Sequence, residues 1–259
     1  MPADQDTGAS HDPGVKHDPG AKHDPGASHE TGADSVSLLA ALLALTVVSG
    51  LVDAVSYLGL GHVFTANMTG NVVVLGFAAA GAPGFSITAT LTSLGVFLAG
   101  AVLGGRVAGR VRERGRLLTA TMAFEAVAIG AAALVAFLAG TAPGWPRLTV
   151  IAILAMAMGM RNAAVRRIGI RDLTTTVLTQ TLTGLAADSR LAGGADPRAG
   201  RRAGAVVAML AGAACGAALF LHVGPALPLL IAAGVSTATA AVFWAGPVRR
   251  DPAVRGSAS

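Results

Sequence analysis

Long apolar runs separated by short polar stretches fill the chain from about residue 36 onward. An α-helix needs about 20 apolar residues to cross the hydrocarbon core of a bilayer, and most of these runs approach that length. The pattern predicts eight apolar segments, at about 36–58, 64–81, 86–106, 117–139, 147–165, 173–187, 203–221 and 226–245. We therefore predict an all-α fold, a polytopic bundle of membrane helices.

The second and sixth segments differ from the other six. Both are rich in Thr, Asn, Gln and Gly, as in the stretch VFTANMTGN at 63–71, and the segment at 173–187 is too short for a full crossing. Irregular backbone at membrane depth is tolerated only where protein buries it or where it lines a wet cavity. We expect both segments to be re-entrant or broken, and to face each other in the interior.

An internal repeat relates these two segments. GLVDAVSYLGLGHVFTANMTGN at 50–71 aligns with GMRNAAVRRIGIRDLTTTVLTQT at 159–181, at an offset of 109 that drifts to 110. LAGAVLGG at 98–105 matches LAGAACGA at 210–217, at an offset of 112. Matches in the same order predict two halves of four segments each. The predicted divisions are a tail at 1–34, repeat one at 35–140, repeat two at 141–248 and a C-terminal tail at 249–259.

The first 34 residues have a different character. The unit His-Asp-Pro-Gly recurs every six residues without an apolar period, which predicts a disordered tail. Four histidines beside acidic residues could bind a divalent metal weakly, but we favour a solvated extension.

Composition agrees with a membrane protein. Hydrophobic residues make up 53% of the chain and charged residues 13%, with a mean hydropathy of +0.63, whereas soluble domains carry about 25% charged residues. The net charge of +5 comes from short arginine clusters between apolar segments. Such clusters encode membrane topology, so we do not expect a nucleic acid as partner. The lone cysteine, Cys215, lies in an apolar run and is assigned to packing.

The arginine clusters predict an inverted arrangement. Basic residues follow the third segment and flank the sixth on both sides, which places these ends in the cytoplasm. The flanks of the second segment contain no Lys or Arg, which suits two external ends. Six full crossings and two re-entrant segments then remain, with both termini cytoplasmic. Eight crossings with parallel repeats are the alternative, which would place the cluster from Arg190 to Arg202 outside.

The polar residues of the two odd segments are candidates for lining a substrate path. The path hypothesis comprises Asp53, Thr65, Asn67, Thr69, Asn71, Glu125, Asn162, Thr175, Thr179 and Gln180. The alternative is that the hydroxyl and amide groups only join helices through hydrogen bonds.

Two carboxylates, Asp53 and Glu125, stand within or at the end of apolar segments. Ionisable groups at membrane depth are costly and are functional candidates by default. Either could relay a proton, bind a cation, or pair with an arginine such as Arg161. Asp53 also aligns with Asn162 in the repeat.

Two Gly-x-x-x-Gly motifs occupy equivalent places in the two halves. Their glycines, Gly100, Gly104, Gly212 and Gly216, predict close helix crossings. The sequence contains no nucleophile elbow, phosphate loop, Cys/His metal set or dinucleotide fingerprint. We therefore expect neither an enzyme nor a bound metal or cofactor.

The motifs at 50–71 and 158–186 resemble those of the YoaK-like family of uncharacterised bacterial multipass membrane proteins. The resemblance covers about 36–245 and implies a multipass protein of the bacterial inner membrane, without naming a substrate. Gln180 departs from the expected pattern, because a glycine should follow Thr179 as Gly70 follows Thr69.

These observations favour a small transporter or channel for a small polar solute or ion. The alternative is a non-transporting assembly or sensory partner whose polar segments serve helix packing. The bilayer is the one certain partner, and the small-residue faces are compatible with a homo-oligomer.

Overall fold

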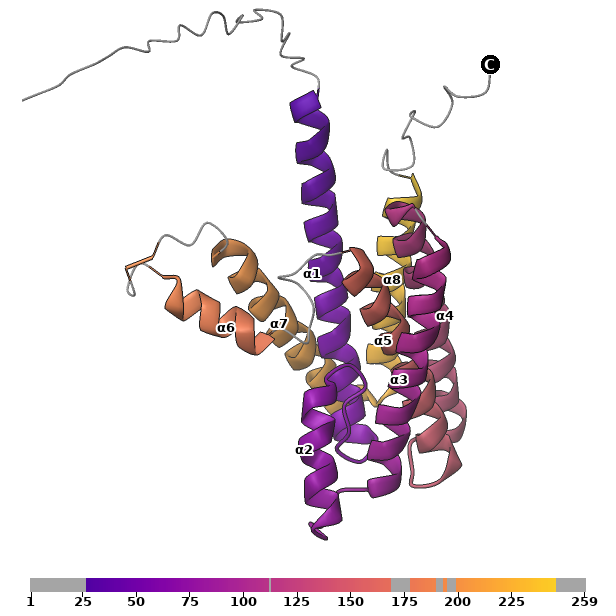
Figure 1. Ribbon diagram of the computed structural model, residues 1–259. Helices are drawn as coiled ribbons and strands as arrows, with labels where there is room; N and C mark the ends of the chain where they lie inside the picture. Colours follow the sequence, from indigo (N-terminus) through magenta and orange to yellow (C-terminus); the bar gives the residue numbers. More distant parts are fainter. Residues whose placement is uncertain (1–26, 112, 169–177, 190–192, 195–198, 246–259) are drawn as a thin grey trace, which may run out of the picture.

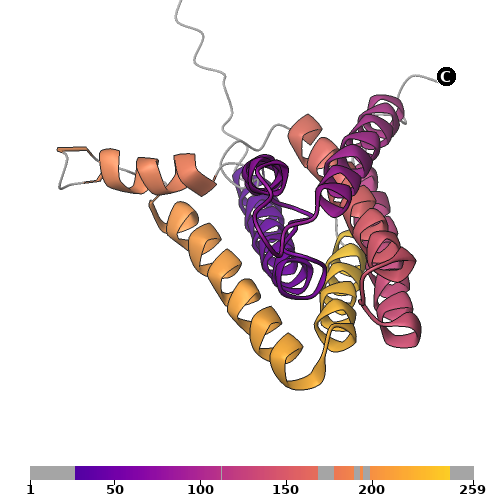
Figure 2. The same ribbon diagram turned by 90° about the horizontal axis from the view of Figure 1, so that it is seen from below.

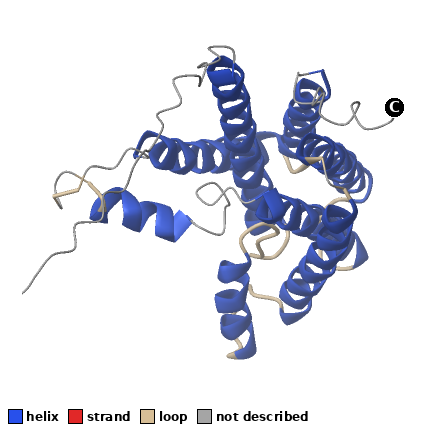
Figure 3. Ribbon diagram, turned by 45° about the horizontal axis from the view of Figure 1, so that its top comes forward, coloured by secondary structure: helices blue, strands red, loops and turns tan. Residues whose placement is uncertain are grey.

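The computed structural model describes residues 27–111, 113–168, 178–189, 193–194 and 199–245. All regular structure in these ranges is helical (Figure 1; Figure 3). The helices are α1 (Ala27–Gly59), α2 (Met68–Ala79), α3 (Ile87–Arg110), α4 (Arg114–Ala139), α5 (Trp145–Ile168), α6 (Leu178–Ala187), α7 (Ala199–Val223) and α8 (Ala226–Ala245). The predicted all-α bundle is confirmed.

Among the described residues, six helices are long and apolar enough to cross a membrane: α3, α5, α7, α8 and the parts of α1 and α4 at Leu39–Gly59 and Gly115–Ala139. Their outer faces carry large apolar side chains, such as Val127, Phe137 and Leu221, while charged side chains are buried among them. This distribution reverses that of a soluble protein and suits hydrocarbon surroundings.

A shared apolar core fixes the relative positions of the long helices. Val52 of α1, Ile129 of α4, Leu154 of α5 and Leu229 of α8 are fully buried in one cluster. The helix α1 lies in the middle, with α6 and α7 on one side and α4, α5 and α8 on the other (Figure 2).

The helices α2 and α6, with 12 and 10 residues, are each too short to cross a bilayer alone. After α1 ends at Gly59, residues 60–67 form no helix, and α2 then lies beside the starting turns of α3 at the same end of the bundle (Figure 1). The expectation that the second segment is re-entrant stays a prediction. The helix α6 packs on α7, and residues 169–177 before it lie outside the described residues.

Two features differ from the expectations. The helix α1 begins at Ala27, although the apolar segment was expected from residue 36. In addition, α2 packs on α3 and α6 packs on α7, so each short helix contacts the long helix that follows it instead of facing the other short helix.

Glycines allow two of the helix pairs to approach closely. Gly212 and Gly216 of α7 lie against Val47 and Leu51 of α1, and Gly50 of α1 lies against the backbone of α7. The pair of α3 and α5 has the same construction. There Gly100 and Gly104 of α3 lie against Met156 and Met160 of α5, and Gly159 of α5 lies against α3.

We predict opposite effects for alanine at two adjacent glycines of α3. A Cβ at Gly104 would meet the backbone oxygen of Met160 at 2.6 Å, whereas a Cβ at Gly105 would meet nothing within 4 Å. Gly104→Ala should therefore lower the free energy of unfolding by about 1–3 kcal/mol through overpacking. Gly105→Ala should raise it by about 0.5–1 kcal/mol, because alanine is the better helix former. Unfolding in detergent micelles measures both, and equal effects would contradict the close crossing.

Candidate functional site

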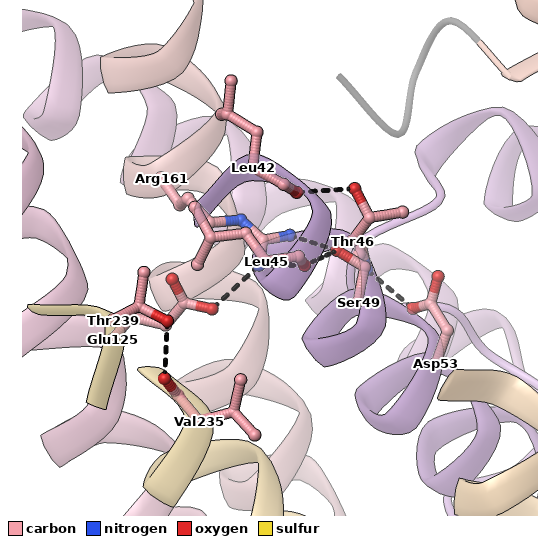
Figure 4. Close-up of polar contacts among 10 residues, drawn as sticks. Leu42, Leu45, Thr46, Ser49, Asp53, Glu125, Arg161, Val235 and Thr239 are labelled. Atoms are coloured by element: carbon pink, nitrogen blue, oxygen red, sulfur yellow. Dashed lines mark hydrogen bonds and ion pairs between the residues drawn. The ribbon is translucent and has the colours of Figure 1, made fainter. Parts of the chain in front are cut away.

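Arg161 occupies the centre of the bundle and joins three helices. From α5, its Nη1 donates to Oε1 of Glu125 in α4 at 2.8 Å and to the backbone oxygen of Leu45 in α1 at 3.2 Å. Its Nη2 donates to the hydroxyl of Ser49, also in α1 (Figure 4). Both charged side chains are almost fully enclosed, at 5% and 0% exposure. Arg161 therefore neutralises Glu125 and donates hydrogen bonds to two oxygen atoms of α1 within the apolar interior.

Asp53 lies one helical turn beyond Ser49 on α1 and holds the start of the re-entrant segment. Its Oδ1 accepts hydrogen bonds from the backbone N–H groups of Thr65 at 2.9 Å and Ala66 at 2.8 Å. The helix α2 begins two residues later, and its N-cap residue, Asn67, makes no side-chain capping bond. A carboxylate at this position offsets the positive end of the α2 dipole and satisfies amides that the helix leaves open.

Asn71 holds the same segment from the other side. Its Oδ1 accepts from the backbone N–H of Phe64 at 2.8 Å, and its Nδ2 donates to the backbone oxygen of Phe64 at 2.6 Å. Ser93 of α3 donates to that oxygen at 2.6 Å and accepts from Nδ2 of Asn71 at 3.1 Å. The side chain of Asn71 thus hydrogen-bonds to both the N–H and the C=O of Phe64, as a neighbouring strand would. Buried backbone groups outside regular structure need such partners.

Several buried polar atoms have no hydrogen-bond partner among the described residues. They are Oδ2 of Asp53, Oγ1 of Thr65, Oε2 of Glu125, Nδ2 of Asn162 and Oγ of Ser236. Ser236 of α8 lies near Glu125. Thr65 and Asp53 are neighbours, because the amide of Thr65 binds the other oxygen of that carboxylate. Buried polar groups normally find a partner, so these atoms are candidates for contact with a further polar group.

The remaining candidates lie apart from this centre. Asn67 is half-buried at the start of α2, and Thr69 is exposed. Thr179 and Gln180 are exposed on α6, and Thr175 lies outside the described residues. The structure therefore brings together Asp53, Thr65 and Asn71 with the pair of Glu125 and Arg161, and separates them from the described part of the sixth segment.

Three contributors were not singled out from the sequence. Ser49 carries a signal that could have revealed it, because it lies four residues before Asp53 and therefore on the same face of α1. Ser93 and Ser236 carry no such signal, since their roles depend on how α3 and α8 pack. Among the described residues, no three His, Cys, Asp or Glu side chains come together in a way that could hold a metal ion.

The six apolar spans and the enclosed charges define a polytopic α-helical membrane protein. Comparison with known proteins gives its family. A family model described as "Protein of unknown function (DUF1275)" matches residues 41–242, so the chain belongs to that family. The chain is also 35% identical over 152 residues to the UPF0700 transmembrane protein YoaK of Bacillus subtilis (strain 168). That match covers 58% of this chain and 65% of the relative, just under two thirds of its length. No solved structure gives a significant match. The resemblance to the YoaK-like family is confirmed.

We predict that Asn71→Ala destabilises the protein, whereas Thr69→Ala does not. The alanine at 71 leaves the backbone N–H of Phe64 without its partner in an enclosed place, which should lower the free energy of unfolding by about 1–3 kcal/mol. Thr69 is exposed two residues before Asn71 on the same helix and serves as the matched control. Thermal unfolding in the same detergent compares the two variants, and equal melting temperatures would refute the role of Asn71.

Proposed function

We propose that the protein is a small secondary transporter or channel that moves a small polar solute or ion across the bacterial inner membrane without converting it chemically. The observation that carries this proposal is the enclosed polar centre, in which Asp53, Glu125 and Arg161 lie inside membrane-spanning helices. Ionisable groups at such depth are costly and characteristic of ion and substrate pathways.

The charge balance supports Asp53 as the ionisable element of the proposed path. The centre contains two carboxylates and one guanidinium group, and the guanidinium hydrogen-bonds to Glu125. In the described residues Asp53 hydrogen-bonds to backbone amides and to no basic side chain. One oxygen of Asp53 and the hydroxyl of Thr65 still lack partners. A cation, a proton or a polar group of the solute would satisfy these atoms.

The pairing of helices supports an internal repeat with inverted halves. The first helix of each half, α1 or α5, packs on the third helix of the other half, α7 or α3. Gly50 and Gly159, which are 109 residues apart, lie in these two crossings, and each faces a Gly-x-x-x-Gly motif. Inverted repeats place broken helices and their solute near the middle of the membrane, where the start of α2 meets Asp53.

Charge supports the orientation that belongs to this proposal. Arginines cluster at the end of α3 and the start of α4, and again at the end of α5 and the start of α7. The positive-inside rule assigns these ends, and with them both termini, to the cytoplasm.

A second candidate has one specific observation in its favour. Asn71 and one oxygen of Asp53 hydrogen-bond to the backbone of the re-entrant segment, which is a structural use of polar side chains. A non-transporting membrane protein, such as an assembly or sensory partner, would need these bonds and nothing more.

Flux through proteoliposomes separates the two candidates. A thermal-shift screen of the purified protein against metabolite and ion classes first selects the solute to be tested. Asp53→Asn keeps an oxygen for the amides of Thr65 and Ala66 and removes the charge, so the fold should persist while flux is lost. Asn67→Leu should also abolish flux by closing the path at the start of α2.

The control for lost charge is Glu113→Gln, because Glu113 is an exposed carboxylate outside the polar centre. It should leave flux unchanged. Folded Asp53→Asn and Asn67→Leu variants with the flux of the unmodified protein would favour the structural role over a path.

A further inference from the structure

A second feature of the molecule lies at the arginine-rich end of the bundle, far from Asp53 along the chain. The first three turns of α4 and the last turn of α8 line a pocket of about 330 Å³. Its lining consists of Gly115, Arg116, Thr119, Ala120, Ala123, Phe243 and Trp244. The two helix ends lie side by side at this end of the bundle (Figure 1).

The pocket faces outward at the level of lipid headgroups. The apolar spans of the two helices, Gly115–Ala139 and Ala226–Ala245, both reach their limits there. Ala120, Ala123 and Trp244 are exposed, and only the base of the pocket, formed by Gly115 and Phe243, is buried. Tryptophan is enriched at this boundary between hydrocarbon and water.

The pocket has a mostly apolar lining and one positively charged side chain, that of Arg116. The α4 side of the pocket is lined by small residues, Gly115, Thr119 and Ala123. They leave space for a hydrocarbon chain to lie against Trp244. The side chain of Arg116 stands at the mouth and is 65% exposed. Its contact with Glu113, at 3.7 Å on the same helix, is too long and too exposed to hold the guanidinium.

The start of α4 adds further positive potential. The N-cap residue, Glu113, makes no side-chain capping bond, and the first turn contains no acidic residue. The open amides of that turn and the helix dipole favour an anion.

We propose that this pocket binds one anionic phospholipid. Arg116 and the first turn of α4 hold the phosphodiester, and an acyl chain lies between Ala120, Ala123 and Trp244. The net positive mouth selects a headgroup with net negative charge, such as phosphatidylglycerol, over a zwitterionic headgroup such as phosphatidylcholine. The proposal does not depend on transport, since none of these residues belongs to the polar centre.

The two tryptophans of the chain provide the test. Trp244 lies in the pocket, and Trp145, at the start of α5, lies at the opposite end of α4 and is also exposed. Trp145→Phe leaves Trp244 as the fluorescent reporter, and Trp244→Phe leaves Trp145 as its control. Each full-length variant is placed in vesicles that contain acyl-brominated phosphatidylglycerol or acyl-brominated phosphatidylcholine at the same mole fraction, since bromine quenches tryptophan.

Trp244 should be quenched more by the brominated phosphatidylglycerol than by the phosphatidylcholine, and Trp145 should show no such preference. Arg116→Gln should reduce the preference about fivefold, the effect of one arginine beside an anionic lipid surface. Arg110→Gln removes the same charge from the same end outside the pocket, and should leave the preference unchanged.

Two further variants separate a pocket from a charged surface. Ala120→Leu fills the pocket without changing charge and should abolish the preference, whereas Ala131→Leu on an exposed part of α4 should not. Equal preferences at the two tryptophans, or equal effects of Arg116→Gln and Arg110→Gln, would overturn the proposal. Recovery of Trp244 emission on addition of inorganic phosphate would also overturn it, because the site would then take a free anion instead of a lipid.

Discussion

The ion pair between Arg161 and Glu125 is the interaction on which the rest of the described bundle depends. An isolated charge inside a membrane protein is strongly unfavourable, so α4 and α5 must bring these two side chains together wherever both helices cross the membrane. Arg161 has further donors, and these bind Leu45 and Ser49 of α1. One guanidinium group therefore fixes three helices in register, and the apolar cluster around Val52, Ile129 and Leu154 packs about that register.

The same requirement explains the re-entrant segment. Irregular backbone within a membrane needs internal partners for its N–H and C=O groups. Asp53 supplies an acceptor from α1, Asn71 supplies an acceptor and a donor from α2, and Ser93 supplies a donor from α3. The polar stretch VFTANMTGN is thus partly a means of supporting a chain that enters and returns. One oxygen of Asp53 and the hydroxyl of Thr65 take no part in these hydrogen bonds. We assign these two groups to the solute or ion.

Most of the fold could be predicted from the sequence because long apolar runs have one stable form in a bilayer. The last helix lies at 226–245 as predicted, and the second segment forms a helix of only 12 residues, too short to cross a bilayer alone. The partnership of Glu125 with Arg161 was one of several alternatives. The sequence alone could not decide between this pairing, a proton relay and a cation site for Glu125. The two residues are 36 positions apart, and the distance between them depends on how α4 packs against α5.

Other parts of the candidate site did not follow from residue type. Thr69, Thr179 and Gln180 resembled Thr65 and Asn71 in polarity, yet they are exposed. Whether a polar residue of a short helix faces protein or surroundings depends on its helical phase and on its packing neighbour, and a 10- or 12-residue helix carries too few apolar positions to show that phase. Ser93 was missed because its partner, the backbone of Phe64, has no signature in a sequence.

The most direct test of the central claim is a double-mutant cycle between Glu125 and Arg161, measured as free energies of unfolding in one detergent. Each single substitution, Glu125→Gln or Arg161→Gln, leaves the other charge enclosed and should cost about 3–5 kcal/mol. The double variant leaves no enclosed charge from this pair, so it should be destabilised by clearly less than the sum of the two single variants. Additive effects would contradict the account, because they would mean that the two side chains do not stabilise each other and that the bundle does not depend on their pairing.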